Sequence, residues 1–281
     1  MILDGKETAA ALKDALTEEL EALRSGGKTP KLAIVLAGSS KPSAMYAAFM
    51  QKVAAGYGIP VELVKKDDTI SEEELITVIH GLNDDPSITG ILMMMPLPEG
   101  IDESRVIEEI APDKDVDGLT TANMGRLAAG KDGLFPCTPR ACMAILDHYH
   151  IPVDGKRAVV IGRSTVVGGP VAQLLQRRNA TVTVCHSHTK HLEELTREAD
   201  ILVAALGRPG TVTADMVKPG AVVIDVGINR VEGKTVGDVA YDEVKTVAGA
   251  VTPVPGGVGS VTTTMVIEAI LRALRLQARG K

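Results

Sequence analysis

Short apolar runs alternate with helix-like patterns along almost the whole chain, and this alternation restricts the fold more than any other feature of the sequence. Leucines between Leu12 and Leu23 keep helical spacing, and Gly26–Gly27 ends that helix. The apolar runs that follow in the first half predict buried strands at Leu32–Leu36, Val61–Val64 and Ile88–Met95.

Helices are expected between these strands. Ser43 is expected to cap a helix that runs to about Gly56. Ser71 and Glu74 have the spacing of a capping box, which predicts a helix through about Leu82. Strands that alternate with helices in this way form a parallel sheet that is covered on both faces.

A second series of the same kind begins after Pro136–Pro139. It starts with a helix over about residues 140–149, and a further helix ends near Arg178. The expected strands are Ala158–Ile161, Thr181–Cys185, Ile201–Ala204 and Ala221–Val226. This alternation of strands and helices is typical of a Rossmann-type unit. We therefore expect an α/β protein of two domains with a cleft between them.

Composition and charge limit the possible partners. The 281 residues carry a net charge of −6, which does not favour nucleic acid or an anionic membrane. No apolar run is long enough to span a membrane, and the first residues do not resemble a signal peptide. The three cysteines form neither a Cys-x-x-Cys pair nor an even set, so we expect reduced thiols in the cytoplasm.

The segment Val159–Pro170 reads as a strand, a tight turn that carries Gly162 and Gly168, and the start of a helix. Backbone amides and the helix dipole at such a turn suit a phosphate group. The segment is not Gly-x-Gly-x-x-Gly, so a plain strand-to-helix turn is the alternative interpretation.

The end of the next strand favours NADP over NAD. NAD enzymes usually carry an acidic residue there for the ribose hydroxyls. This chain instead continues after Cys185 with His186, Ser187 and His188, and no carboxylate follows before Glu193. Arg163, Ser187 and His186 are candidates to hold a 2′-phosphate. The histidines lack the spacing of a metal motif, and no metal is expected.

The segment Thr252–Gly259 is the most distinctive loop of the chain. Two prolines fix φ and three glycines permit backbone angles that other residues adopt only at a cost. The loop leads into a helical pattern from Val261 to Leu274. Such a loop lets main-chain amides approach a flat or anionic ligand.

Taken together, these segments resemble the methylenetetrahydrofolate dehydrogenase/cyclohydrolase family. The resemblance covers the whole chain, because several long motifs occur in the family's order and spacing. They are Leu3–Lys6, Pro112–Gly118, Asn123–Leu127, Pro136–Pro139, Gly162–Ser164, Gly237–Val239 and Pro255–Gly259.

The resemblance implies a folate-facing catalytic domain over residues 1–138, onto which a C-terminal helix over about residues 261–281 packs. It also implies an NADP-binding Rossmann-type domain over residues 139–260, and a homodimer. The substrate residues that it implies are Tyr46, Asp117, Pro255, Gly256, Gly257 and Val258. The cofactor residues that it implies are Gly162, Arg163, Ser164, Val167, Gly168, His186, Ser187 and Ile228.

Two positions depart from the family pattern. The family's active site uses Tyr-x-x-x-Lys, and this chain keeps Tyr46 but has Met50 at the lysine position. Met94 occupies the position of the family's glutamine. The catalytic positions are therefore Tyr46, Met50, Met94 and Asp117. Lys52 does not replace the missing lysine, because it lies about 240° around the helix from Tyr46, whereas Met50 lies about 40° away.

Methionine carries no charge and cannot transfer a proton, so the replacement of the family's lysine and glutamine is expected to change the reaction. Hydrolysis of the methenyl group needs proton transfer, whereas hydride transfer depends mainly on positioning. We expect an NADP-dependent methylenetetrahydrofolate dehydrogenase with weak or absent cyclohydrolase activity. An ordinary bifunctional enzyme and a folate- and NADP-binding relative with lost or altered activity are the alternatives.

Overall fold

The computed structural model describes residues 1–279 of a chain that divides into two compact units. The first unit contains residues 1–12 and 136–265, and the second contains residues 13–135 and the chain from Val266 onward. Residues 1–12 thus group with the C-terminal sheet and not with the rest of the region 1–138. The functional boundaries at residues 138 and 260 stay a prediction.

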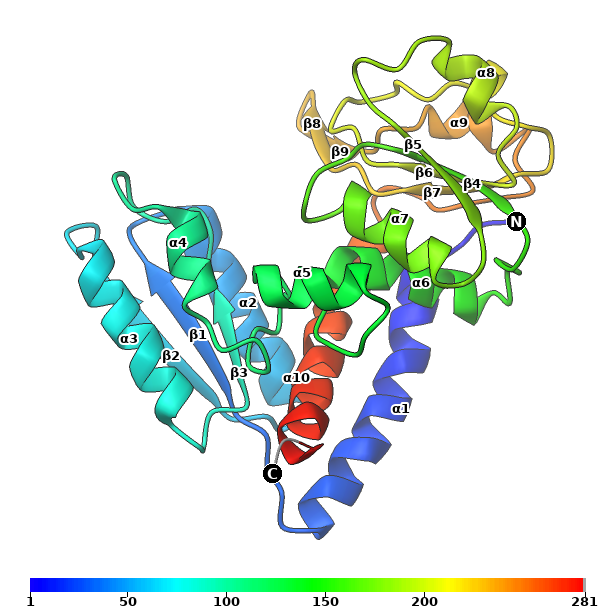
Figure 1. Ribbon diagram of the computed structural model, residues 1–281. Coiled ribbons are helices and arrows are strands. Elements are labelled where there is room, and N and C mark those ends of the chain that lie inside the picture. Colours follow the sequence, from blue (N-terminus) through cyan, green and yellow to red (C-terminus); the bar gives the residue numbers. More distant parts are fainter. Residues whose placement is uncertain (280–281) are drawn as a thin grey trace. The chain divides into compact units, whose positions relative to one another are not determined.

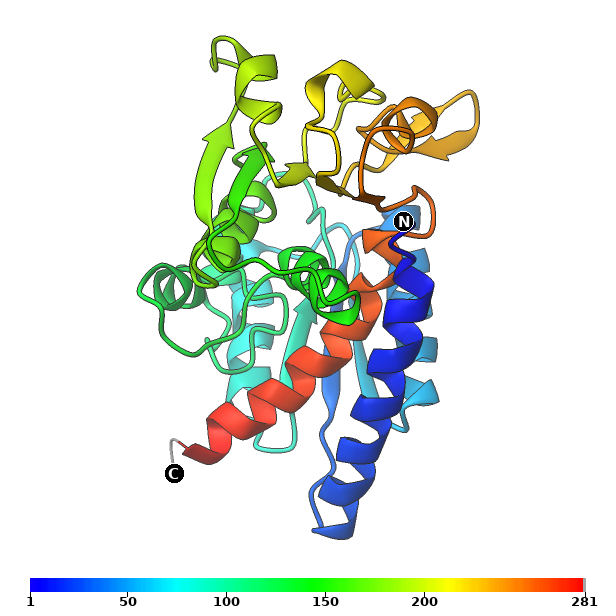
Figure 2. The ribbon, with the colours of Figure 1, turned by 90° about the vertical axis from the view of Figure 1, so that its right-hand side faces the viewer.

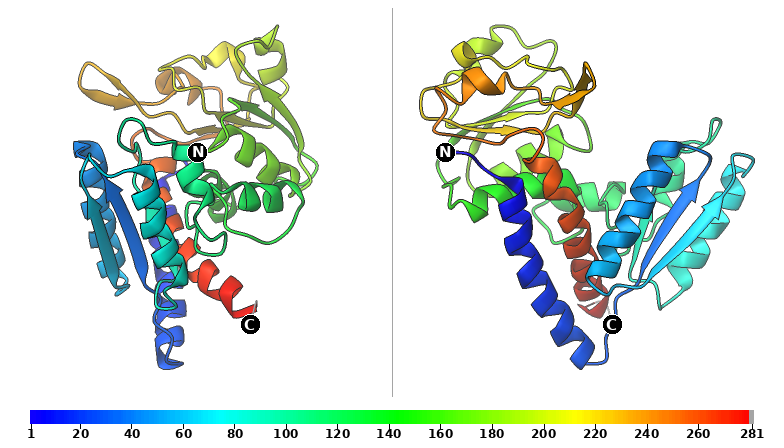
Figure 3. Two further views of the ribbon diagram at one scale, coloured as in Figure 1. Left: turned by 60° about the vertical axis from the view of Figure 1, so that its left-hand side comes forward. Right: turned by 180° about the vertical axis from the view of Figure 1, so that it is seen from behind.

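The second unit is built on a three-stranded parallel sheet with the strand order β2-β1-β3. Helix α2 lies on one face, and helices α3 and α4 lie on the other (Figures 1 and 3). Every residue of the central strand is buried as a result. The strands and helices of this unit are β1 (Leu32–Ala37), α2 (Lys41–Gly56), β2 (Val61–Lys66), α3 (Glu72–Asp84), β3 (Gly90–Met93), α4 (Glu103–Glu108) and α5 (Thr121–Ala128).

Two local predictions in this unit have opposite outcomes. The capping box of Ser71 and Glu74 is confirmed, since each side chain accepts the other residue's backbone amide. The predicted cap at Ser43 is wrong, because helix α2 begins at Lys41 and Ser40 is its cap. Ser43 is instead buried, and its hydroxyl donates to the carbonyl oxygen of Met95 at 2.8 Å. Pro42 lies in the first two positions of the helix, where proline is favoured, so the helix begins about one turn before the predicted start.

The first unit contains a five-stranded parallel sheet with the order β10-β7-β6-β4-β5. The Rossmann-type architecture is confirmed, and the strand order reverses between β4 and β6. In doubly wound sheets of this kind, ligands bind at the carboxyl ends of the strands near that switch point. The strands are β4 (Arg157–Ile161), β5 (Thr181–Cys185), β6 (Ile201–Ala204), β7 (Val222–Asp225) and β10 (Ala250–Val251), and β8 (Asn229–Val231) and β9 (Lys234–Val236) form a separate hairpin.

Helices cover both faces of this sheet (Figure 1). An aliphatic core between the strands and helices α8 and α9 includes Leu202, Val223 and the helix residue Val244. The helices of this unit are α6 (Cys137–His148), α7 (Gly168–Gln176), α8 (Leu192–Thr196) and α9 (Tyr241–Val244). The helices α1 (Gly5–Ser25) and α10 (Thr262–Arg279) each continue across the division of the chain.

The N-terminal residues extend the edge of this sheet. Ile2 pairs in parallel with Val251 of β10, and the amide of Leu3 donates to the carbonyl oxygen of Val251 at 2.9 Å. Figure 2 shows the N-terminus beside the segment that carries β10. Residues 1–3 therefore serve as an additional edge segment next to the loop that follows β10.

Candidate functional site

The turn between β4 and α7 lies at the switch point of the first unit's sheet. Gly162 has a φ of 125°, a conformation that favours glycine. A Cβ at Gly162 would collide with the carbonyl oxygen of Ala205, and one at Gly168 would collide with the carbonyl of Gly162. The turn therefore needs both glycines for its close backbone packing, as a dinucleotide-binding turn does.

Ser164 organises the start of helix α7. Its hydroxyl accepts the amides of Val167 at 3.2 Å and Gly168 at 3.3 Å, and its carbonyl oxygen accepts the amide of Gly169 at 3.0 Å. These amides at the helix start are thus already satisfied within the protein. A phosphate would be held here by side chains such as the exposed Arg163, or would displace the Ser164 hydroxyl.

The predicted 2′-phosphate residues lie at the carboxyl ends of the adjacent strands β4 and β5. Gly162 donates its amide to the carbonyl oxygen of Cys185 at 2.9 Å, which joins the two strand ends. His186 is half-buried, and the next residue, Ser187, is exposed. Thr189 closes the turn by accepting the His186 amide at 2.9 Å. A positive Arg163 beside a polar turn fits a phosphate better than a ribose diol.

The histidines of this turn bond to one another. The Nδ1 atom of His186 accepts the backbone amide of His188 at 3.2 Å. Within residues 1–279, no three His, Cys, Asp or Glu side chains are grouped in a way that could hold a metal ion. The expectation of no metal stays a prediction.

The signature loop, defined here as residues 252–259, lines a cavity of about 260 Å³ in the first unit. Ile228, which is 70% exposed, and Thr235 line the same cavity. Asp225 at the end of β7 also reaches it. Burial raises the pKa of Asp225 to about 6, although three backbone amides donate to its carboxylate and oppose the shift. The predicted residues Pro255, Gly256, Gly257, Val258 and Ile228 are therefore gathered around one cavity.

A residue that was not among the predicted site residues supports this loop. The amide of Gly5 donates to the carbonyl oxygen of Gly256 at 2.8 Å. A Cβ at Gly5 would collide with the carbonyl oxygen of Gly257. The hydroxyl of Tyr149 accepts the amide of Asp4 at 2.8 Å and fixes the same N-terminal turn. The Leu3–Lys6 motif was visible in the sequence, but its contact with the loop was not.

In the second unit, Tyr46 and Met50 lie one turn apart on α2. Tyr46 is 40% exposed, whereas Met50 is 0% exposed. Lys52 is exposed on another part of the helix. Met50 is therefore fully buried, and an ammonium group at this position would be desolvated.

Met94 directly follows β3 and is 2% exposed. Its amide donates to the carbonyl oxygen of Val35 at 2.9 Å. The bond from Ser43 to the carbonyl of Met95 ties this segment to the start of α2. The structure thus links α2, which carries Tyr46 and Met50, directly to the segment of Met94.

Asp117 is half-buried and lies in a segment that its neighbours hold rigidly. The Nζ of Lys114 donates to the carbonyl oxygens of Leu82, Asn83 and Asp85 at the end of α3, at 3.0, 2.6 and 2.8 Å. Burial lowers the pKa of Lys114.

The residue after Lys114 anchors the other side of this segment. Asp115 accepts the amide of Thr120 at 2.9 Å and the side-chain amide of Asn123 at 3.1 Å. Lys114 and Asp115 therefore fix the backbone that presents Asp117.

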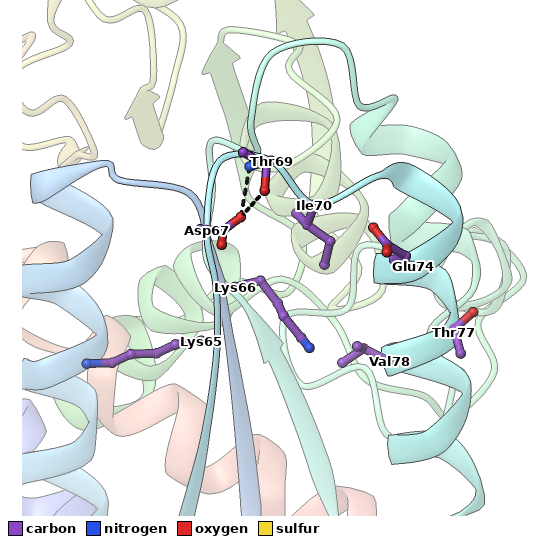
Figure 4. Close-up of a pocket in the computed structure, with 8 residues that line it drawn as sticks. All are labelled: Lys65, Lys66, Asp67, Thr69, Ile70, Glu74, Thr77 and Val78. Atoms are coloured by element: carbon purple, nitrogen blue, oxygen red, sulfur yellow. Dashed lines mark hydrogen bonds between the residues drawn. The ribbon is translucent and has the colours of Figure 1, made fainter.

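A further surface pocket of about 560 Å³ lies in the second unit between the end of β2 and α3 (Figure 4). Lys66 and Val78 face each other across it, whereas Lys65 points to the opposite side of the strand. Asp67 accepts the amide of Thr69 at 2.9 Å. None of the predicted site residues lines this pocket.

The fold and the site define a class of protein. A doubly wound parallel sheet with a glycine-dependent turn at its switch point, joined to a second parallel α/β unit, is typical of dinucleotide-binding α/β proteins. Among residues 1–279, no helix is both long enough and apolar enough to cross a membrane.

Comparison with known proteins identifies the family. Residues 3–117 match the tetrahydrofolate dehydrogenase/cyclohydrolase catalytic domain, and residues 136–278 match the NAD(P)-binding domain of the same family. A protein named "Bifunctional protein FolD" from Brevibacillus brevis is 48% identical over 279 residues, which span 99% of this chain and 98% of that relative. The chain belongs to the tetrahydrofolate dehydrogenase/cyclohydrolase family.

Solved structures agree with this assignment. The crystal structure of bifunctional FolD from Campylobacter jejuni has a TM-score of 0.95 and 41% identity, and the match covers 99% of each chain. FolD from Trypanosoma brucei, solved with NADP cofactor and an inhibitor, has a TM-score of 0.91 and 36% identity, and the match covers 99% of this chain and 98% of that one.

Proposed function

We propose that this protein is an NADP-dependent 5,10-methylenetetrahydrofolate dehydrogenase that has little or no cyclohydrolase activity. Membership of the family supports the dehydrogenase activity, as does the NADP complex of the Trypanosoma brucei relative. The exposed Arg163, which follows Gly162 at the strand end joined to the β5 turn, supports NADP as the cofactor, and the two close-packed glycines support a dinucleotide-binding turn.

One observation carries the second half of the proposal. The positions at which the family resemblance expects a lysine and a glutamine hold Met50 and Met94, and these side chains are 0% and 2% exposed. Neither can donate a hydrogen bond or exchange a proton. Hydrolysis of the methenyl carbon needs proton transfer from water, and these two positions offer no group for it.

Hydride transfer makes fewer demands on the protein. Bound NADP supplies an acceptor for the hydride that leaves the methylene carbon, while the lone pair of the neighbouring folate nitrogen forms the new C=N bond. The chain's own residues need only orient the reactants and exclude water. In this proposal Tyr46 and Asp117 hold the folate, and the signature loop takes part in holding the reacting groups.

The proposal is tested by following NADPH formation and the methenyl absorbance band in the same reaction. We expect one equivalent of methenyltetrahydrofolate to persist for each NADPH formed. An ordinary bifunctional enzyme, which the names of the relatives favour, would form NADPH without accumulating the methenyl product. A relative that had lost turnover would form neither.

The proposal extends to the assembly and location of the protein. We propose a homodimer, which follows from the family resemblance, and a cytoplasmic location, which follows from three cysteines that are all buried and form no disulfide among residues 1–279. Sedimentation of the purified protein tests the dimer, and cell fractionation tests the location.

A further inference from the structure

Two buried carboxylates at the carboxyl edge of the first unit's sheet are interlocked. Asp225 ends strand β7 and is 3% exposed, and Asp238, which follows β9, is 0% exposed. The carboxylate of Asp225 accepts the backbone amides of Asp238 and Val239, each at 3.0 Å, and that of Gly227 at 2.9 Å. The first carboxylate therefore fixes the backbone that carries the second.

The carboxylate of Asp238 is bonded in turn to the loop after β6. It accepts the backbone amides of Leu206 at 2.6 Å, Gly207 at 2.9 Å and Arg208 at 2.8 Å. The side-chain amide of Asn229 donates to it at 2.9 Å. Four donors thus converge on one buried side chain, and three of them are consecutive amides of a single loop.

Two glycines make this arrangement possible. A Cβ at Gly227 would collide with the carboxylate of Asp238, and a Cβ at Gly237 would collide with the carboxylate of Asp225. Each aspartate therefore occupies the space that a glycine leaves in the opposite segment.

The interlock joins three loops at the carboxyl ends of neighbouring strands. Thr252, at the start of the signature loop, accepts the amide of Asp225 through its hydroxyl at 2.7 Å. Through Asp225 and then Asp238, the signature loop is connected to residues 206–208 after β6. Residues 207 and 208 are exposed, while the carboxylate behind them is fully buried.

The loop that Asp238 holds begins at the switch point. Ala205 donates its amide to the carbonyl oxygen of Ile161 at 2.8 Å and lies against Gly162 of the cofactor turn. A dinucleotide bound at this crevice would lie along residues 206–208. The backbone amides of residues 206–208 all bond to Asp238, which holds this loop in one conformation.

We propose that Asp238 is a positioning residue for the dinucleotide cofactor, which it serves by holding the loop of residues 206–208 in the conformation that accepts the cofactor. The inference rests on the proposed function, because it takes NADP as the ligand of this crevice. In this proposal Asp238 supports the cofactor site without touching the cofactor, and its loss affects the binding of NADP but not the binding of folate.

The test compares Asp238→Asn with the unmodified protein in calorimetric titrations with NADP and in steady-state assays. Asparagine has the same shape, but an NH2 group that donates replaces one of the two oxygens that accept the amides of residues 206–208, so at least one of these amides loses its acceptor. We expect the Kd and KM for NADP to rise about tenfold or more, and the KM for methylenetetrahydrofolate to stay within about twofold. A purely structural role would lower the active fraction without this difference between the two KM values.

Two further variants keep the test decisive. Asn229→Ala removes one donor to Asp238 and leaves the loop amides in place, so we expect an increase of about threefold in the KM for NADP. Asp200→Asn is the matched control. Asp200 accepts the Lys218 ammonium at 2.6 Å and the Arg157 amide at 3.0 Å at the amino ends of the same strands. It should not change either KM.

The outcomes are distinguishable. An unmodified protein that bound no NADP would overturn the proposed function and this inference together. NADP binding in the unmodified protein that neither Asp238→Asn nor Asn229→Ala weakened would overturn the inference alone. If Asp238→Asn does not fold, Asn229→Ala decides, and an unchanged KM for NADP in that variant would contradict the proposal.

Discussion

The backbone amide of Gly5 donates to the carbonyl oxygen of Gly256 at 2.8 Å, so the first turn of helix α1 is attached directly to the signature loop. The absence of a side chain at Gly5 is what allows this contact, because a Cβ there would collide with the carbonyl oxygen of Gly257. The N-terminus is thus part of the structure that shapes the cavity.

We predict that Gly5→Ala displaces the signature loop. The added methyl group should destabilise the protein by about 1–3 kcal/mol, as overpacking does, and should lower kcat/KM for the dehydrogenase reaction by about tenfold or more. Gly81→Ala is the matched control, since an added Cβ there meets no atom within 4 Å. Thermal unfolding and steady-state kinetics measure both effects. Normal kinetics in Gly5→Ala would show that the loop does not depend on this contact.

We predict that Arg163→Ala weakens NADP binding selectively. Loss of a charge-assisted pair with the 2′-phosphate should cost about 1.5–3 kcal/mol, while affinity for NAD should hardly change. Arg157→Ala is the matched control. Arg157 lies at the amino end of β4, the strand that precedes Arg163, and its loss should change the affinity for neither nucleotide. Titration with both nucleotides measures the difference, and equal affinity of the unmodified protein for NAD and NADP would contradict the assignment.

Asp225 makes a pH-dependent contribution to stability. Its pKa is raised from 3.8 to about 6, chiefly by burial, so folding takes up a proton between these values. The contribution of this group to the free energy of unfolding is therefore greatest below pH 3.8 and is lost as the pH rises through about 6. A shift of this size corresponds to about 2–3 kcal/mol.

The Asp225→Asn variant isolates this contribution, because the other titrating groups are common to both proteins. We expect the free energy of unfolding of the unmodified protein minus that of Asp225→Asn to decrease between about pH 4 and pH 6.5 and then to become constant. Urea unfolding at several pH values measures this difference. A difference that did not vary over that range would show that the carboxyl group titrates near its ordinary value.

The two methionine positions should behave as a coupled pair. Met50→Lys places an ammonium group at a site that is 0% exposed, so we expect this variant to lose about 2 kcal/mol of stability or more and to gain little hydrolysis. Met50→Lys combined with Met94→Gln should gain more cyclohydrolase activity than the two single variants together. Hydrolysis assays of the four proteins, corrected for the buffer rate, measure the coupling. Equal hydrolysis rates in all four proteins would show that residues 50 and 94 do not determine the cyclohydrolase activity.

The strands could be predicted well from the sequence because their signal is local. The sequence predicts Ile201–Ala204 and Thr181–Cys185 with the observed limits. The first is a short, fully buried apolar run, and the second is an edge strand of alternating threonine and valine, residues that favour strands. Ile88–Met95 was predicted too long, because the apolar run continues past Met93 while the backbone bends at Met95 and Pro96. Apolar character alone does not show where pairing ends.

The supports of the site could not be predicted, because they depend on contacts between distant segments. Gly5 and Gly256 lie near opposite ends of the chain, and the bonds of Asp238 to residues 206–208 require the folded sheet. The cap of α2 was missed for a local reason, since Ser40 and Ser43 carry the same signal. The predicted roles of Tyr46, Met50, Met94 and Asp117 stay predictions that experiments with folate must decide.

The central claim is tested most directly by the rate at which the unmodified protein hydrolyses methenyltetrahydrofolate. Purified methenyltetrahydrofolate is mixed with the enzyme, and the decay of its absorbance band is compared with decay in buffer and with the rate of NADPH formation in the forward reaction. General acid–base help is typically worth about 10²–10⁴-fold, so its loss is readily detected. We predict active dehydrogenation with hydrolysis close to the buffer rate. Enzymatic hydrolysis as fast as dehydrogenation, in protein free of any other cyclohydrolase, would contradict the account.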